Sequence, residues 1–157
     1  MRTVKEWLSD FFFPERAPDE ACFSQEVVDD ICVLARGAYP KEFVAFLQGK
    51  IVKRGERRVA LVDGLSVIKY VANERSTAFD LHDLPLLHGS VGTVHSHPAP
   101  DPRPSAADRR LFERFGWCHV IIGTPYTARS FVCYDMKGRP FPWSVTGSSL
   151  GDGRKPL

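Results

Sequence analysis

Residues 91–108 read VGTVHSHPAPDPRPSAAD, and their order of residue types predicts a strand, a loop and a helix. Val91, Thr93 and Val94 are β-branched, and the composition of residues 91–97 predicts a strand. Four prolines in residues 98–104 predict a stiff loop that ends the strand. Ser105 has the character of a helix N-cap, and we expect the helix to run through Phe115 and to end at Gly116. The stretch therefore predicts a strand and a helix joined by a rigid reversal.

Further elements are expected on both sides of this stretch. A helix is predicted after the N-cap Ser24, because apolar residues recur at helical spacing up to Ala35, and Gly37 and Pro40 end it. The other expected elements are strands at 41–49 and 57–62, a turn at 63–64, strands at 66–71 and 77–81, a loop at 82–90, strands at 118–123 and 130–135, and a short strand near residue 141. Antiparallel hairpins with two flanking helices place the chain in the α+β class, as an α/β sandwich.

The chain of 157 residues fits one domain with flanking segments. We expect residues 1–22 to be an N-terminal appendage, either a short amphipathic helix packed on the domain or an exposed aromatic patch for a partner. Residues 23–145 are expected to form the domain. Residues 146–157, rich in Gly and Ser, are expected to be a disordered tail.

The composition excludes several classes of function. Basic residues number 21 and acidic residues 19, so the net charge of +2 gives no reason to expect nucleic acid or an anionic membrane as partner. No apolar run has the roughly 20 residues of a membrane span. The N-terminus lacks the pattern of a signal peptide, and we therefore expect a cytoplasmic protein.

The four cysteines, Cys22, Cys32, Cys118 and Cys133, form no CxxC pair. In a reducing compartment each is expected to be a small buried hydrophobic residue. A disulfide between Cys118 and Cys133, which fall in neighbouring predicted strands, stays open as an alternative.

His95, His97 and Asp108 form the candidate metal site. Side chains alternate along a strand, so His95 and His97 project from one face, whereas Ser96 points to the other face and is expected to be structural. The loop and helix place Ser105 and Asp108 one turn apart on one side. Two imidazoles and one carboxylate are ligands that zinc uses, and catalytic zinc sites leave the fourth position to water. The pattern predicts an open zinc site.

Each piece also has a simpler interpretation. Histidines separated by one residue on a strand can be satisfied by hydrogen bonds alone, and Ser-x-x-Asp at a helix start is usually a capping arrangement. The capping and metal-binding roles of Ser105 and Asp108 are compatible with each other.

Glu42 is the candidate general base. It stands beside an apolar run at residues 43–47, where a charge is costly without a purpose. Glu42 also lies at the edge of the expected strand, after Pro40 and Lys41. A solvent-exposed acid at the end of a strand, without a catalytic role, is therefore an equally open interpretation.

Five residues together resemble the motif of the JAMM (MPN+) zinc metalloprotease family, a distant Glu followed by HxHPx6SxxD. They are Glu42, His95, His97, Ser105 and Asp108. Residues 40–49 and 92–97 are similar to the family's first strand and metal strand, and the resemblance extends from about residue 24 to 142, as in the short prokaryotic members. It implies an α/β sandwich with a curved, mostly antiparallel sheet, in agreement with the predicted elements.

The resemblance also implies a mechanism. One zinc ion, held by His95, His97 and Asp108, would lower the pKa of a bound water. Glu42 would take the water proton and return it to the leaving amine, and Ser105 would donate a hydrogen bond to the developing oxyanion.

The implied activity is cleavage after the C-terminal Gly-Gly of a ubiquitin-like small modifier conjugated to a protein lysine. Two alternatives remain, a hydrolase that releases cysteine from a sulfur-carrier protein and a non-catalytic interaction scaffold. The oligomeric state and any need for a partner stay open.

Overall fold

The structure is a computed structural model that describes residues 17–67 and 89–146. Its strands are β1 (Glu20–Ser24), β2 (Val44–Arg54), β3 (Arg57–Val67), β4 (Ser90–Ser96), β5 (Cys118–Ile122), β6 (Phe131–Asp135) and β7 (Trp143–Thr146). Its helices are α2 (Gln25–Ala38), α3 (Ala106–Phe112) and the short 3-10 helix η2 (Ala128–Ser130). The described strands form one sheet in the order β6-β5-β4-β2-β3-β1-β7.

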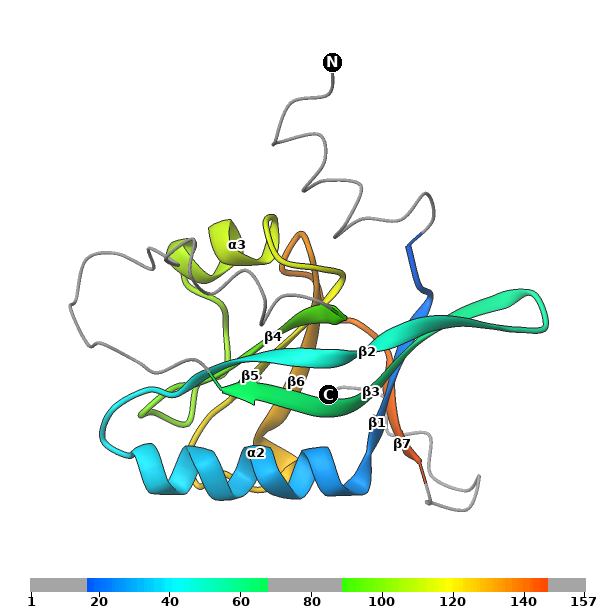
Figure 1. The fold of residues 1–157 in the computed structure, drawn as a ribbon. Coiled ribbons are helices and arrows are strands. Elements are labelled where there is room, and N and C mark those ends of the chain that lie inside the picture. The colour runs from blue at the N-terminus through cyan, green and yellow to red at the C-terminus, as the bar shows by residue number, and fades with distance from the viewer. Residues whose placement is uncertain (1–16, 68–88, 147–157) are drawn as a thin grey trace.

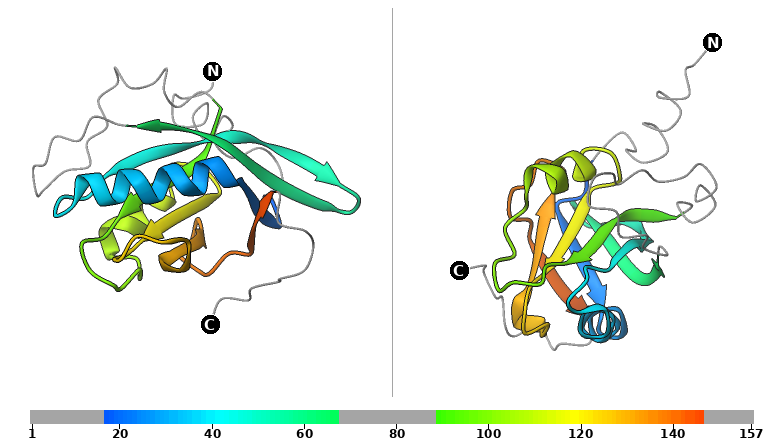
Figure 2. Two further views of the ribbon diagram at one scale, coloured as in Figure 1. Left: turned by 90° about the horizontal axis from the view of Figure 1, so that it is seen from below. Right: turned by 90° about the vertical axis from the view of Figure 1, so that its left-hand side faces the viewer.

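The sheet is mixed. Strand β2 pairs antiparallel with β3 and β4, and β5 pairs antiparallel with β6. Strand β1 is parallel to β3 and β7, and β4 is parallel to β5. Helices α2 and α3 lie on opposite sides of the sheet (Figures 1 and 2). The predicted α+β class is confirmed.

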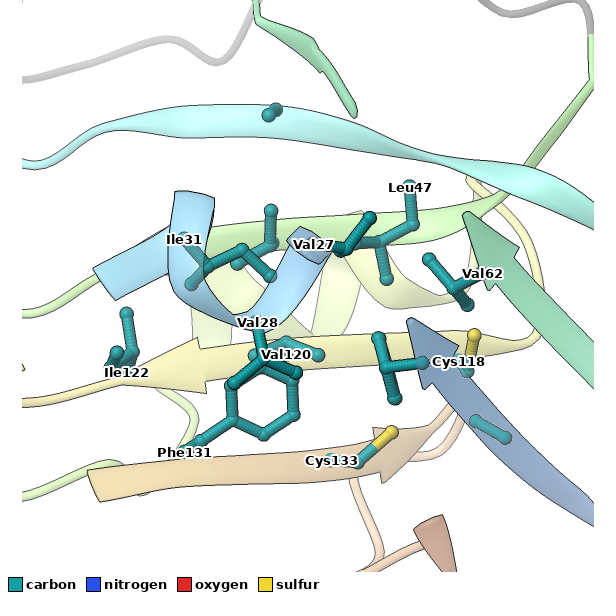
Figure 3. Packing of buried hydrophobic residues seen from close by; sticks show 14 of the residues in the cluster. Val27, Val28, Ile31, Leu47, Val62, Cys118, Val120, Ile122, Phe131 and Cys133 are labelled. Carbon is teal, nitrogen blue, oxygen red and sulfur yellow. The ribbon is translucent and has the colours of Figure 1, made fainter. Parts of the chain in front are cut away.

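Helix α2 forms where the sequence predicts it. The hydroxyl of Ser24 accepts a hydrogen bond from the amide of Val27 at 3.2 Å, which caps the first turn. The apolar stripe of α2 is buried against the sheet, and Figure 3 shows Val28 and Ile31 facing side chains of β5 and β6. This layer between α2 and the sheet is the main core.

The other face of the sheet carries a smaller core under α3. Because side chains alternate along β5, Val120 and Ile122 join the main core, whereas Ile121 packs with Phe112 of α3 and Tyr134 of β6. The metal candidates lie on this second face. Helix α3 is thereby held close to the end of β4.

The structure corrects the N-terminal boundary. Residues 20–22, expected to belong to the appendage, lie in β1, which is inserted between β3 and β7. Ala21 and Phe23 are fully buried. The strand is too short, and too close to Pro18 and to the N-cap of α2, to show the periodicity that reveals longer strands.

The β2–β3 hairpin differs most from expectation. The predicted turn at 63–64 is wrong, because β3 is continuous and the chain turns at Gly55 and Glu56, with Gly55 at φ 61°. The predicted strand end at Gly49 is also wrong, since β2 continues to Arg54 through a bulge at Gln48/Gly49. A Cβ on Gly49 would lie 1.8 Å from the carbonyl oxygen of Leu61. This glycine therefore permits close contact between β2 and β3 and does not end the strand.

Other boundaries shift by a few residues. Helix α3 ends at Phe112 and not at Phe115, and the last strand is β7 and not a strand near residue 141. All four cysteines are buried and free, so the alternative disulfide between Cys118 and Cys133 does not form. The expected helix in residues 1–22, most of the expected strand at 66–71, the strand at 77–81, most of the loop at 82–90 and most of the tail lie outside the described residues. No described helix is long and apolar enough to cross a membrane.

Candidate metal centre

Strand β4 presents two imidazoles at one point. His95 is buried, with 3% of its surface exposed, and pairs with Val44 of β2 on one side and Ile121 of β5 on the other. His97 follows the last residue of β4, and its amide donates to the carbonyl oxygen of Ile122 at 2.9 Å. The Nε2 atoms of the two histidines lie 3.2 Å apart, so the prediction that they share a face is confirmed.

Helix α3 brings the carboxylate. The hydroxyl of Ser105 accepts from the amide of Asp108 at 3.2 Å, and Oδ2 of Asp108 accepts from the amide of Ser105 at 2.6 Å, which forms a capping box. Oδ1 of Asp108 lies 3.1 Å from Nε2 of His95, and Oδ2 lies 3.4 Å from Nε2 of His97. Asp108 therefore caps the helix and faces both imidazoles at once.

The spacing of these atoms fits a tetrahedral metal ion. Ligand atoms about 2.0–2.1 Å from a tetrahedral zinc ion lie about 3.3 Å from each other. The two Nε2 atoms are 3.2 Å apart, and each lies 3.1 or 3.4 Å from a different oxygen of Asp108. One ligand atom from each of the three residues lies within 4.8 Å of the other two. Among the described residues no fourth His, Cys, Asp or Glu joins this group. The described residues thus offer three side-chain ligands for one ion.

Charge at the centre also favours a cation. Burial would raise the pKa of Asp108, but hydrogen bonds with His95 and His97 outweigh burial and hold this pKa well below its usual range. The hydrogen bond with Asp108 raises the pKa of His97, although burial opposes it. The carboxylate is therefore ionised at neutral pH and stabilises positive charge between the rings.

The outer nitrogens of the two rings have different surroundings. Nδ1 of His97 lies 3.1 Å from the backbone carbonyl oxygen of Asp101. A carbonyl only accepts, so Nδ1 carries a proton, and Nε2 would be the nitrogen that coordinates a metal ion. Nδ1 of His95 is buried with no hydrogen-bond partner in the described part of the chain. Among the described residues the side-chain polar contacts of His95 therefore lie at Nε2, and Nδ1 lacks the outer acceptor that usually orients a ligating histidine.

Glu42 and Ser105 border this group without joining it. Glu42 is half-buried in the segment just before β2 and not within the strand, as had been expected. Its charge adds to the raised pKa of His97, after larger effects that begin with Asp108. Ser105 is exposed, and since its hydroxyl oxygen accepts from Asp108, the hydroxyl proton is free to donate. Both side chains are thus at least partly exposed to solvent.

Residues 24–134 match the family of prokaryotic homologues of the JAB domain. The chain belongs to this family. A probable metalloprotease from Haloferax volcanii is 31% identical over 117 residues, which cover 73% of this chain and 72% of the relative. The resemblance to JAMM/MPN proteins inferred from the motif is thus confirmed.

Two solved structures share the JAB-domain fold. A JAB1/MPN domain protein from Archaeoglobus fulgidus is 32% identical with a TM-score of 0.58, and the match covers 78% of this chain and 96% of that one. A structure described as JAMM, a metalloprotease-like zinc site in the proteasome and signalosome, is 31% identical with a TM-score of 0.56, covering 81% and 98%.

In this JAB domain Tyr126 lies next to the metal centre, although the sequence offers no reason to single it out. The hydroxyl of Tyr126 donates to the backbone carbonyl of His97 at 3.0 Å, and the carbonyl of Tyr126 accepts from Arg36 at 2.8 Å. Tyr126 has φ 59° and, with Arg36, Tyr39 and Thr124, lines a cavity of about 240 Å³. No local pattern marks this residue, because its partners lie far away in the sequence.

Proposed function

We propose that this protein is a zinc metallopeptidase that cleaves isopeptide bonds after the C-terminal Gly-Gly of a ubiquitin-like small modifier. The observation that carries the proposal is the group of His95, His97 and Asp108, whose ligand atoms lie within 4.8 Å of one another and which no fourth described His, Cys, Asp or Glu joins. The probable metalloprotease among its relatives supports peptidase chemistry. The Gly-Gly substrate rests on the resemblance to the JAMM family.

Zinc bound here would act as a Lewis acid that makes water a better nucleophile and polarises the scissile carbonyl. His95 and His97 would hold the ion as neutral imidazoles, with the His97 ring fixed by its bond to Asp101. The ionised Asp108 would supply the third ligand and one negative charge. These three residues bind and orient, and none of them needs to move a proton.

Proton transfer is assigned to Glu42. Its carboxylate lies outside the ligand group yet close enough to contribute to the raised pKa of His97. In this role it takes a proton from the attacking water and returns it to the amine that leaves, so one carboxylate serves both steps. The hydroxyl of Ser105, anchored as the N-cap of α3, would donate its free proton to the oxyanion that develops on the carbonyl.

The test compares wild type with Glu42→Gln on a modifier joined through Gly-Gly to a lysine ε-amine. We expect one zinc per chain by elemental analysis in both proteins, cleavage by wild type that a chelator abolishes, and no measurable turnover by the variant. Glu26→Gln is the matched control, because Glu26 is an exposed acid in the first turn of α2 and should leave turnover unchanged.

The same assay separates the alternatives. Cleavage of a Gly-Gly-cysteine adduct of a sulfur-carrier protein, without cleavage of the lysine conjugate, would favour release of cysteine. A protein that binds no zinc and cleaves neither substrate would favour a non-catalytic scaffold. Full activity of the Glu42→Gln variant would remove Glu42 from the role of base.

A further inference from the structure

Ser96 ties the metal-binding strand to the main chain beside Glu42. Its side chain is fully buried and lies between the two histidines in sequence. The hydroxyl oxygen of Ser96 accepts from the amide of Phe43 at 3.0 Å, and the amide of Ser96 donates to the carbonyl of Phe43 at 3.1 Å. Two hydrogen bonds thus join the residue between the ligands to the residue that follows Glu42.

The first of these bonds departs from regular strand pairing. In an antiparallel ladder, opposed residues of a hydrogen-bonded pair exchange bonds between their backbone groups alone. The paired register of β2 and β4 ends at Val44 opposite His95, and at Phe43 the acceptor is the Ser96 hydroxyl. The side chain of Ser96 therefore holds the chain where it leaves the ladder, one residue from Glu42.

We infer that Ser96 is a positioning residue that fixes the backbone bearing Glu42 against the metal-binding strand, an inference that rests on the proposed function. Ser96 does not contact the metal centre, since its side chain lies on the opposite face from His95. It acts through the Phe43 amide. Loss of its hydroxyl should therefore slow proton transfer by Glu42 and leave the zinc ligands in place.

The Ser96 side chain does more than fill space in the core, because its hydroxyl satisfies the amide of Phe43. Phe43 is 6% exposed. Without the Ser96 hydroxyl, its buried amide would therefore lose its hydrogen-bond acceptor and could not be satisfied by bulk water. The segment before β2 would then shift to find another acceptor, and Glu42 would move with it. A displacement of about 1 Å in a catalytic group can reduce rate by about 100-fold.

The experiment uses Ser96→Ala, Ser96→Cys and Ser96→Thr in the full chain. Cys keeps the side-chain volume but is a weak acceptor, and Thr keeps the hydroxyl. We expect kcat on the lysine isopeptide conjugate to fall by about 10- to 100-fold in the Ala and Cys variants, with little change in KM or in zinc affinity, and to recover in the Thr variant. Ser90→Ala, the same change at the other end of β4, is the control and should keep kcat.

A second measurement does not depend on turnover. Amide hydrogen exchange followed by NMR should show the Phe43 amide losing protection in the Ala and Cys variants and keeping it in Ser96→Thr. Unchanged Phe43 protection, unchanged kcat in Ser96→Ala, or a Thr variant that melts like wild type yet turns over as slowly as Ala would each overturn the inference. A wild-type protein that binds zinc but cleaves no Gly-Gly conjugate would instead overturn the proposed function, and the role of Ser96 with it.

Discussion

The ring of Phe112 lies nearly parallel to the imidazole of His119, with centroids 4.4 Å apart and planes inclined by 12°. The centroid of the same phenyl ring lies 6.3 Å from the centroid of the His95 imidazole. Phe112 follows Asp108 by four residues, so both project from one face of α3. The helix is therefore fastened to the sheet at its C-terminal end and presents its ligand at the N-terminal end.

Phe112→Ala should weaken both the fold and the metal centre. The side chain is fully buried, and truncation of such a phenylalanine typically costs about 3–5 kcal/mol of unfolding free energy. Since α3 also holds Asp108, we expect weaker zinc binding. Urea unfolding and a competition titration with a chromophoric chelator measure the two effects. Arg110→Ala, an exposed change on the same helix, should alter stability by less than about 0.5 kcal/mol.

His119 predicts a loss of stability in acid. Burial lowers its pKa to about 3, with smaller effects that include a lowering by His95 and a raising by Asp135. Its Nε2 faces the carbonyl of Gly116 at 3.3 Å and its Nδ1 faces the hydroxyl of Thr93 at 2.8 Å, so the neutral ring satisfies both. An unfolded histidine titrates near pH 6.5. The stabilisation is thus complete above about pH 6.5 and is lost as the pH falls toward 3.

The measurement is urea unfolding of wild type and His119→Gln from pH 7.5 down to pH 4. Wild type should lose up to about 1.4 kcal/mol more per pH unit than the variant within this window, because its unfolded chain binds one more proton. Titratable groups that both proteins share contribute equally to the two pH profiles, so their contributions cancel when the profiles are subtracted. Parallel pH profiles would show that His119 is not neutral in the folded state.

The local parts of the site were predictable from sequence. Alternation along β4 places His95 and His97 on one face, and the turn between Ser105 and Asp108 follows from helix geometry. The apolar period of α2 likewise predicts its buried face. Each of these features depends on residues a few positions apart.

The rest depends on partners far apart in the chain. The amide of Phe43 meets the Ser96 hydroxyl across 53 positions, and Arg36 meets Tyr126 across 90. Strand β1 pairs with β3 and β7, and Gly49 makes a close contact with Leu61 that no local pattern reveals. The roles of such residues appear only once the sheet order is known.

Asp108→Asn should abolish tight zinc binding while preserving the helix cap. Asparagine keeps an oxygen that can accept from the Ser105 amide but loses the negative charge that faces both imidazoles. We expect zinc affinity to fall by about 100-fold or more, measured by competition with a chelator. Asp101→Asn is the matched control. The Asp101 side chain bonds Arg103, whereas the backbone carbonyl contacts His97, so affinity should stay unchanged. Equal affinity in the two variants would contradict ligation by Asp108.

Gly92→Ala should disrupt the strand that bears the histidines, for reasons of space alone. A Cβ at Gly92 would lie 1.5 Å from the carbonyl oxygen of Cys118, and a backbone atom cannot rotate away as a side chain can. Strands β4 and β5 would have to separate, at a cost of about 3 kcal/mol of unfolding free energy.

Gly37→Ala is the opposite case, since nothing lies within 4 Å of its Cβ position in α2. There alanine should stabilise by about 0.5–1 kcal/mol through helix propensity. Urea unfolding of the metal-free proteins measures both, and a Gly92→Ala protein as stable as wild type would show that β4 and β5 are not in such close contact.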